Sequence, residues 1–113
     1  MQGKNLSHFP LRAMYTFEKA SSPQGSIVQV GVTASKKNFK KAVERNRIKR
    51  LLREAYRLQK HSLLDLVKQK QIRVHVFFMY MDKTLPLFET IQESMAKCLT
   101  QLQKAAEGYE RTA

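Results

Sequence analysis

The sequence has few of the residues that form disulfides in small secreted domains or that make up metal-binding and catalytic sites. It contains one cysteine, four glycines, three prolines, no tryptophan and only nine acidic residues among 113. A single cysteine cannot form an internal disulfide, and Cys98 lies in a helical pattern that favours a small buried side chain. The three histidines are scattered, and no cluster has metal-ligand spacing. Phosphate loops and nucleophile elbows are also missing, so the sequence indicates no catalytic group.

Long hydrophobic runs are missing too. No segment is apolar enough to span a bilayer, and no signal peptide is visible at the N-terminus. We therefore expect a cytoplasmic protein without a membrane partner. Length and ordinary apolar content predict one domain, residues 1–113, with flexible ends at 1–8 and 107–113. No metal or other cofactor is expected on the protein alone.

What the chain has in excess is positive charge. It has 21 Lys and Arg residues and a formal net charge of +12, which favours nucleic acid as a partner through phosphate neutralisation. Residues 36–60 hold eleven of these cations and two acids. Membrane binding would require bulky aromatic residues on the apolar face of a basic helix. That face consists here of Ile, Leu and Ala, which indicates packing against a core.

The same basic segment has the apolar period of a helix over about residues 41–60. Its apolar side is predicted to carry Ile48, Leu51, Leu52, Ala55 and Leu58. Its opposite side is predicted to carry Asn46, Lys49, Arg50, Arg53 and Arg57, flanked by Arg45 and Arg47. A solvated face normally mixes charges of both signs. This stripe has almost one sign only, so it favours a phosphate-binding surface.

Alternating apolar residues predict strands over 9–17, 27–34 and 72–81. The turn residues at 21–25 predict that the first two strands form a hairpin. Both faces of 72–81 are apolar, which predicts a strand that is central or covered on both sides. A further helical turn or two is expected at 62–70. Pro86 and the apolar spacing after it predict a helix to about residue 106.

The resulting ββαβα order predicts an α+β fold, a two-layer α/β sandwich with helices on one face of the sheet. The other face is then free. We expect it to carry residues such as Tyr15 beside basic side chains, an arrangement suited to stacking with unpaired nucleotides. The alternative for Tyr15 is an ordinary half-buried strand aromatic, and the residues alone favour that alternative.

One ordered motif narrows the partner. Ser35-Lys36-Lys37, followed by AVERNRIKRLLREAYR at 42–57, resembles the signature of the bacterial ribonuclease P protein subunit. The family pattern reads roughly SKK, a short linker and AVxRNRxKRxxREaaR. Weaker agreement covers 9–17 and 72–106. The chain departs from the pattern at 38–41, where many members have a three-residue linker with Gly. It also has only residues 1–8 where members normally carry a helix.

The resemblance implies a fold and a division of labour. The fold would be a sandwich like a domain of a small-subunit ribosomal protein, with a left-handed crossover through the basic helix. The protein would assist a catalytic RNA that removes the 5′ leader of precursor tRNA, with Mg²⁺ held by the RNA and the substrate phosphate. No protein side chain would be catalytic, and the protein would be a monomer in the holoenzyme.

The resemblance also implies site residues. The residues that would contact the catalytic RNA are Lys36, Lys37, Arg45, Asn46, Arg47, Lys49, Arg50, Arg53 and Arg57. The open sheet face, with Tyr15 and Arg12, would bind the leader. Composition alone leaves open a non-enzymatic ribosomal or ribonucleoprotein-assembly protein, and the ordered motif argues against it. DNA is not an expected partner, because groove readers need base-edge donors and usually a dimeric or paired-helix context.

Overall fold

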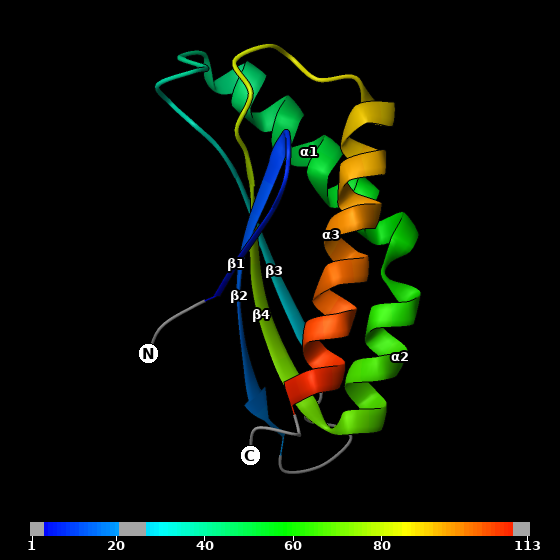
Figure 1. Ribbon diagram of the computed structural model, residues 1–113. Helices are drawn as coiled ribbons and strands as arrows, with labels where there is room; N and C mark the ends of the chain where they lie inside the picture. Colours follow the sequence, from blue (N-terminus) through cyan, green and yellow to red (C-terminus); the bar gives the residue numbers. More distant parts are fainter. Residues whose placement is uncertain (1–3, 21–26, 110–113) are drawn as a thin grey trace.

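The helices cover one face of a mixed sheet, and the other face is free of them in the described part of the chain (Figure 1). The computed structural model describes residues 4–20 and 27–109. The strands are β1 (Lys4–His8), β2 (Leu11–Lys19), β3 (Val28–Ala34) and β4 (Ile72–Tyr80). The helices are α1 (Ala42–Gln59), α2 (His61–Lys70) and α3 (Phe88–Tyr109). The predicted α+β class and layering are confirmed, whereas the ββαβα order lacked β1 and the separate helix α2.

Strand β4 lies inside the sheet, whose order is β1-β2-β4-β3. It pairs antiparallel with β2 and parallel with β3. The predicted hairpin of the first two long strands is therefore wrong, because β4 lies between them. The apolar strand 72–80 gains two neighbours in this position, which outweighs the closeness of β2 and β3 along the chain. The predicted turn at 21–25 lies outside the described residues.

The predicted flexible ends are partly wrong. Residues 4–8 form the edge strand β1, which pairs antiparallel with β2 across the turn at Phe9 and Pro10. Only Leu6 of this strand is buried, so the sequence pattern was too short to indicate it. At the other end, α3 continues to Tyr109, beyond the expected end near residue 106. Residues 1–3 and 110–113 lie outside the described residues.

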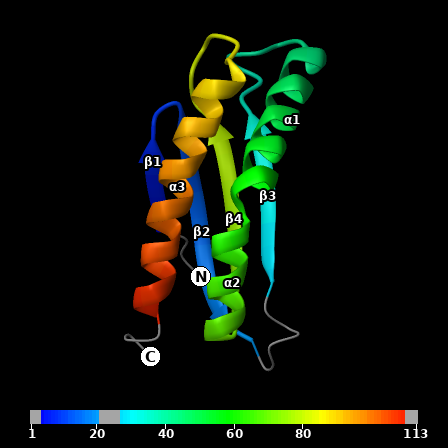
Figure 2. The same ribbon diagram turned by 90° about the vertical axis from the view of Figure 1, so that its right-hand side faces the viewer.

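The three helices divide one face of the sheet among them (Figure 2). Helix α3 packs on β1 and β2, α1 packs on β3 and on α3, and α2 contacts β4 and α3. Strand β4 is central, as predicted, but it is covered on one side only. The core consists of its buried face, Ile72, Val74, Val76, Phe78 and Tyr80, and of the helix residues above it. Burial of Cys98 in α3 raises the pKa of its thiol to about 11.

Helix α1 packs through Ile48, Leu52 and Ala55, at the predicted helical spacing. Leu58, which was predicted to share this face, is 46% exposed. The side chain of Gln59 takes the inward place at the end of the helix. Its Nε2 donates to the Ala55 carbonyl at 3.3 Å and to the Gln92 carbonyl of α3 at 3.0 Å. A hydrogen bond between α1 and α3 therefore takes the place of the apolar contact that the helical period had predicted for Leu58.

The two leucines of α1 allow a matched test of this packing. Leu52→Ala is expected to destabilise the fold by about 2–5 kcal/mol, because Leu52 is fully buried and its loss leaves a cavity. Leu58→Ala makes the same chemical change on the same helix and is expected to cost less than about 1 kcal/mol. Urea unfolding of both variants measures the difference. Equal losses would show that our assignment of the packed face is wrong.

Candidate nucleic-acid interface

The exposed side of α1 is a row of basic side chains. Arg47, Arg50 and Arg53 are exposed along it, Asn46 is exposed beside them, and Lys49 is partly exposed. No acidic side chain of the described residues forms an ion pair with any of the three arginines. Figure 2 shows α1 over β3, at the side of the molecule opposite β1. The structure thus brings Arg47, Arg50 and Arg53 of the predicted stripe together as a surface without an acidic partner in the described residues.

The positive charge of the row weakens toward the end of α1. Arg57 donates to both carboxylate oxygens of Glu54, from Nε at 2.9 Å and from Nη2 at 2.7 Å. The hydrogen bond from Arg57 is the main cause that lowers the pKa of Glu54; desolvation opposes this shift, and the charge of Arg57 adds to it. Glu54 is therefore ionised at neutral pH and offsets the charge of Arg57. Arg57 was predicted to bind RNA with the others, and it is the one member of the row with an acidic partner in the described structure.

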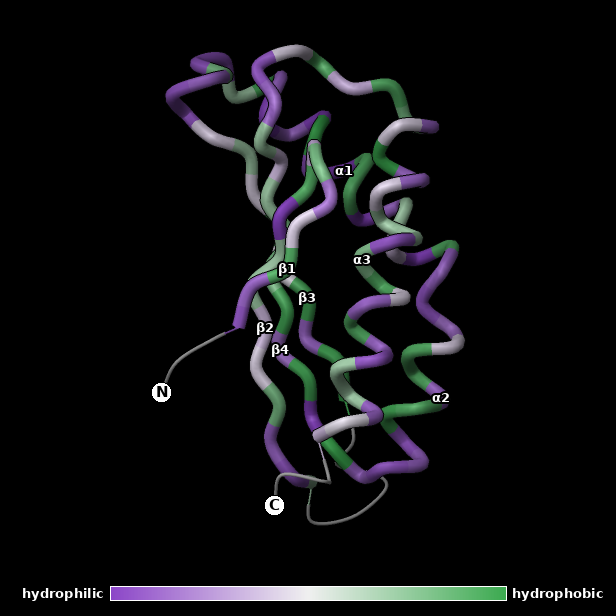
Figure 3. The backbone as a smooth tube through the Cα atoms, viewed as in Figure 1, coloured by the Kyte–Doolittle hydropathy of each residue, from purple (hydrophilic) through white to green (hydrophobic). Residues whose placement is uncertain are grey.

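The segment that leads into α1 extends the basic surface. We call residues 35–41 the basic turn; it carries four exposed lysines, Lys36, Lys37, Lys40 and Lys41. Figure 3 shows it as a mostly hydrophilic segment at the upper left of the molecule. Within it, Phe39 is only 4% exposed, and its ring centroid lies 6.1 Å from that of Tyr80. The sequence did not indicate this anchor, because a lone aromatic between lysines has no periodicity.

Hydrogen bonds hold the basic turn at both ends. The Phe39 N–H donates to the Ser35 carbonyl at 2.9 Å, and the Lys37 N–H donates to Ser35 Oγ at 3.1 Å. Nη1 of Arg45 donates to the carbonyls of Phe39 at 2.8 Å and of Lys40 at 2.9 Å. Arg45 was predicted as an RNA contact. In the structure its Nη1 lies against the basic turn and the residue is partly exposed, and the RNA contact stays a prediction.

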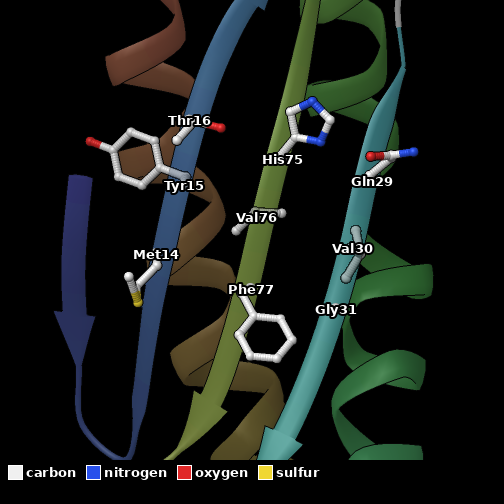
Figure 4. A pocket seen from close by; sticks show the side chains of 9 residues that line it. All are labelled: Met14, Tyr15, Thr16, Gln29, Val30, Gly31, His75, Val76 and Phe77. Carbon is white, nitrogen blue, oxygen red and sulfur yellow. The ribbon is translucent and has the colours of Figure 1, made fainter. Parts of the chain in front are cut away.

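The free face of the sheet forms a second candidate surface, which we call the open face. A hollow of about 460 Å³ lies on it across β2, β4 and β3 (Figure 4). The hollow is lined by Met14, Tyr15, Thr16, Gln29, Val30, Gly31, His75, Val76 and Phe77. Tyr15 and Val76 are among these residues although their side chains belong to the buried series of β2 and β4. Phe77 is 43% exposed, and Arg12 is exposed further along β2, on the same face as Met14. This face thus combines an aromatic ring, apolar side chains and a cation.

The ring of Phe77 lies directly over Gly31 on the neighbouring strand. A Cβ atom at residue 31 would lie 2.3 Å from Cδ1 of Phe77, well inside van der Waals contact. Because residue 31 has no side chain, the ring of Phe77 can lie against the backbone of β3 at this position. Near the start of β4, Oε1 of Glu18 on β2 lies 3.2 Å from Nε2 of His75 and 3.6 Å from Nε of Arg73. That end of the open face is therefore partly neutralised, whereas Arg12 has no acidic partner among the described residues.

The predicted position of Tyr15 on the open face is wrong. The strand register pairs Tyr15 with Val76, whose side chain faces the helices, and Tyr15 is only 8% exposed. Its ring centroid lies 5.3 Å from that of Phe17, which in turn lies 5.4 Å from Tyr109. Figure 4 draws the ring of Tyr15 extending away from His75 and Phe77. Tyr15 shares the side of Leu11 and Ala13, and the two-residue period could have placed it there.

Sequence reasoning missed Phe77 as an open-face aromatic. The apolar residues on both sides of 72–81 predicted a strand that is central or covered on both sides. Strand β4 is central, and its uncovered side leaves Phe77 exposed, as is Met81 just beyond the strand. The signal was available, because Phe77 alternates with the buried series from Ile72 to Tyr80. An aromatic residue on the uncovered side of a central strand is a surface feature suited to ligand contact.

Two general features of the described residues bear on chemistry and location. No three His, Cys, Asp or Glu side chains within 4–20 and 27–109 come together as a group that could hold a metal ion. No helix in the same ranges has the length and apolar character that crossing a bilayer requires. The two candidate surfaces are the exposed basic side of α1, together with the basic turn, and the open face.

Comparisons with known proteins identify the family of the chain. The family model described as Ribonuclease P matches residues 1–103. The ribonuclease P protein component of Porphyromonas gingivalis is 40% identical over 101 residues, covering 89% of this chain and 72% of that protein. The component from Chlorobium phaeobacteroides is 35% identical over 88 residues, covering 72% of this chain and 58% of that protein.

A solved structure supports the fold independently. The ribonuclease P protein of Staphylococcus aureus matches with a TM-score of 0.59, covering 90% of this chain and 82% of that one. At 18% identity, this match supports the fold alone. The family match extends over most of the chain, and the relatives share its sequence over long alignments. The chain therefore belongs to the ribonuclease P protein family, as a protein subunit of the ribonucleoprotein endoribonuclease that processes tRNA.

Proposed function

We propose that this subunit binds the catalytic RNA through α1 and the basic turn, and the 5′ leader of precursor tRNA through the open face. The observation that supports the first part most strongly is the row of Arg47, Arg50 and Arg53, which is exposed and has no acidic partner in the described structure. Family membership implies association with the RNA of ribonuclease P. It also argues against the alternative of a ribosomal or assembly protein.

The physical role of α1 is to neutralise phosphates along one line of the RNA. Each cation that meets a phosphate releases condensed counterions, so binding is strong and falls with salt. Such contacts fix position and orientation and carry no sequence information. A helix that is packed on the core through Ile48 and Leu52 presents its arginines from a rigid base. We therefore assign α1 the task of docking the subunit in one orientation.

The open face offers the complementary chemistry for an unpaired strand. Phe77 presents a ring for base stacking, Met14 adds apolar surface, and Arg12 supplies a cation for the backbone. Mature tRNA lacks the leader, so a contact with the leader favours precursor over product. Arg12 keeps its predicted leader role, and we assign the stacking role to Phe77 instead of Tyr15.

We assign the cleavage chemistry to the RNA. Mg²⁺ in the holoenzyme would be held by the RNA and the substrate phosphate, and would supply the activated water and the stabilisation of charge. The residues of the protein would bind and orient the RNA and the leader. This division agrees with the chemistry of the two surfaces, which offer cations, an aromatic ring and amide groups.

We also infer that the connection from β3 through α1 and α2 to β4 is left-handed, as the resemblance implies. In Figure 2 the helices lie in front of the sheet, the parallel strands β3 and β4 run upward, and β4 lies to the left of β3. This hand is rare among parallel crossovers. A single RNA-binding domain, a monomer in the holoenzyme, a cytoplasmic location and the lack of a DNA partner stay predictions.

The docking role of α1 predicts a specific loss of activity. The double variant Arg47→Glu/Arg50→Glu is expected to abolish stimulation of precursor cleavage at low Mg²⁺, because two phosphate contacts become repulsive. The slope of log affinity against log salt is expected to become shallower by at least about 1.5. Cleavage of precursor tRNA by a bacterial catalytic RNA, with and without protein, measures the first effect. Titrations over a salt series measure the second.

A matched control separates docking from general charge. Lys68→Glu/Lys104→Glu makes the same change in net charge at exposed positions near the ends of α2 and α3. These positions lie away from the basic row, so we expect stimulation to stay within about threefold of wild type. Equal losses in both double variants, with both proteins folded, would remove the case for α1 as the docking surface.

The leader role of the open face predicts a substrate-dependent effect. Phe77→Ala is expected to weaken holoenzyme binding of precursor tRNA by about 1–3 kcal/mol, the usual contribution of one stacked base. Binding of tRNA without a leader should be unchanged. Leu87→Ala is the control, because it removes an exposed apolar side chain outside the sheet. If Phe77→Ala weakens both RNAs equally, or neither, the leader does not stack on this ring.

A further inference from the structure

We propose that the basic turn is a preorganised phosphate-binding site for the catalytic RNA, and that Arg45 is its positioning residue. The inference rests on the proposed docking of this end of the molecule on RNA. It assigns phosphate contacts to Lys40 together with Lys36 and Lys37. It also gives Arg45 a different task from Arg47, although the two stand next to each other in the motif.

The first observation is where the donors of Arg45 go. Its Nη1 carries two N–H groups, and this nitrogen lies 2.8 Å from the Phe39 carbonyl and 2.9 Å from the Lys40 carbonyl. Both distances are those of charge-assisted hydrogen bonds. Arg45 is partly buried, whereas Arg47 is exposed. The donors that a phosphate would need from this nitrogen are therefore already used within the protein.

The second observation is what the basic turn lacks without Arg45. The residue before α1 is Lys41, and no side chain caps the helix at this end. Arg45 lies in the first turn of the helix and binds back to the two carbonyls that precede Lys41. The other anchors are the buried Phe39 ring and the two hydrogen bonds to Ser35. Arg45 thus fixes the last part of the basic turn to the helix.

The third observation is the positive charge of the basic turn that Arg45 holds. All four lysines of the basic turn are exposed, and none forms an ion pair with an acid of the described residues. A flexible lysine-rich loop would lose conformational entropy on binding RNA. A turn that is already ordered avoids much of that cost. The backbone N–H groups at the start of α1 add a field of the same sign.

A double-mutant cycle tests the assignment on the full chain. The variants are Arg45→Met, the pair Lys37→Ala/Lys40→Ala, and their combination, each measured for affinity to the catalytic RNA over a salt series. Arg45→Met should weaken binding roughly tenfold when the lysines are present. It should weaken binding less than about twofold when they are absent, because Arg45 then has no phosphate-binding lysines to position. Arg47→Ala is the control and should cost the same in both backgrounds.

The outcomes separate the possibilities. If Arg45→Met costs the same in both backgrounds and lowers the salt slope by about 0.7–0.9, Arg45 binds a phosphate directly and the proposal is overturned. If the lysine pair has no effect while Arg47→Ala weakens binding, the basic turn is no phosphate site, although docking through α1 stands. If Arg47→Ala also has no effect, the proposed function itself fails.

A measurement on the wild-type protein covers the case in which Arg45→Met does not fold. Phenylglyoxal modifies accessible arginines, and mass spectrometry can follow each site with and without the catalytic RNA. We expect RNA to protect Arg47 and Arg50, whereas Arg45 reacts slowly in both states because its Nη1 is hydrogen-bonded to two backbone carbonyls and the residue is partly buried. Rapid modification of free Arg45, with strong protection by RNA, would contradict the positioning role.

Discussion

The position of β4 between β2 and β3 is the constraint on which the rest of the structure depends. Because β4 runs parallel to β3, the chain must return across the sheet before it can enter β4. Helices α1 and α2 form that return, and both lie on the same face as α3. One strand pairing thus sets α1 over β3 and leaves the opposite face uncovered. The two candidate RNA surfaces exist because of this arrangement.

Sequence reasoning succeeded where a single physical pattern dominated. The period of Ile48, Leu52 and Ala55 predicted both the packed face of α1 and its basic side, and alternation predicted β4 to within one residue. It failed where tertiary contacts decide. Nothing local indicates that β4 separates β2 from β3, and the single apolar residue of β1 is too weak a signal. The side of Tyr15 was available from alternation, whereas Phe39 as an anchor was not.

The two surfaces differ in how they relate to the core. Helix α1 presents charges from the outer side of a packed element, so its geometry follows from core packing. The open face presents the reverse side of the strands whose inner side forms the core, so Phe77 is held by the same backbone that buries Val76 and Phe78. Both surfaces are therefore as rigid as the fold. Under the proposed function, the subunit would orient two RNA segments relative to each other without moving parts of its own.

The packing of the Phe77 ring over Gly31 has an evolutionary consequence. The ring occupies the space that a side chain at residue 31 would need, and the strand register fixes the two positions opposite each other. A larger residue at 31 and an aromatic ring in this place exclude each other. Substitutions at the two positions are therefore coupled: a lineage that abandons the glycine must also change residue 77 or tilt its ring, and with it the shape of the open face.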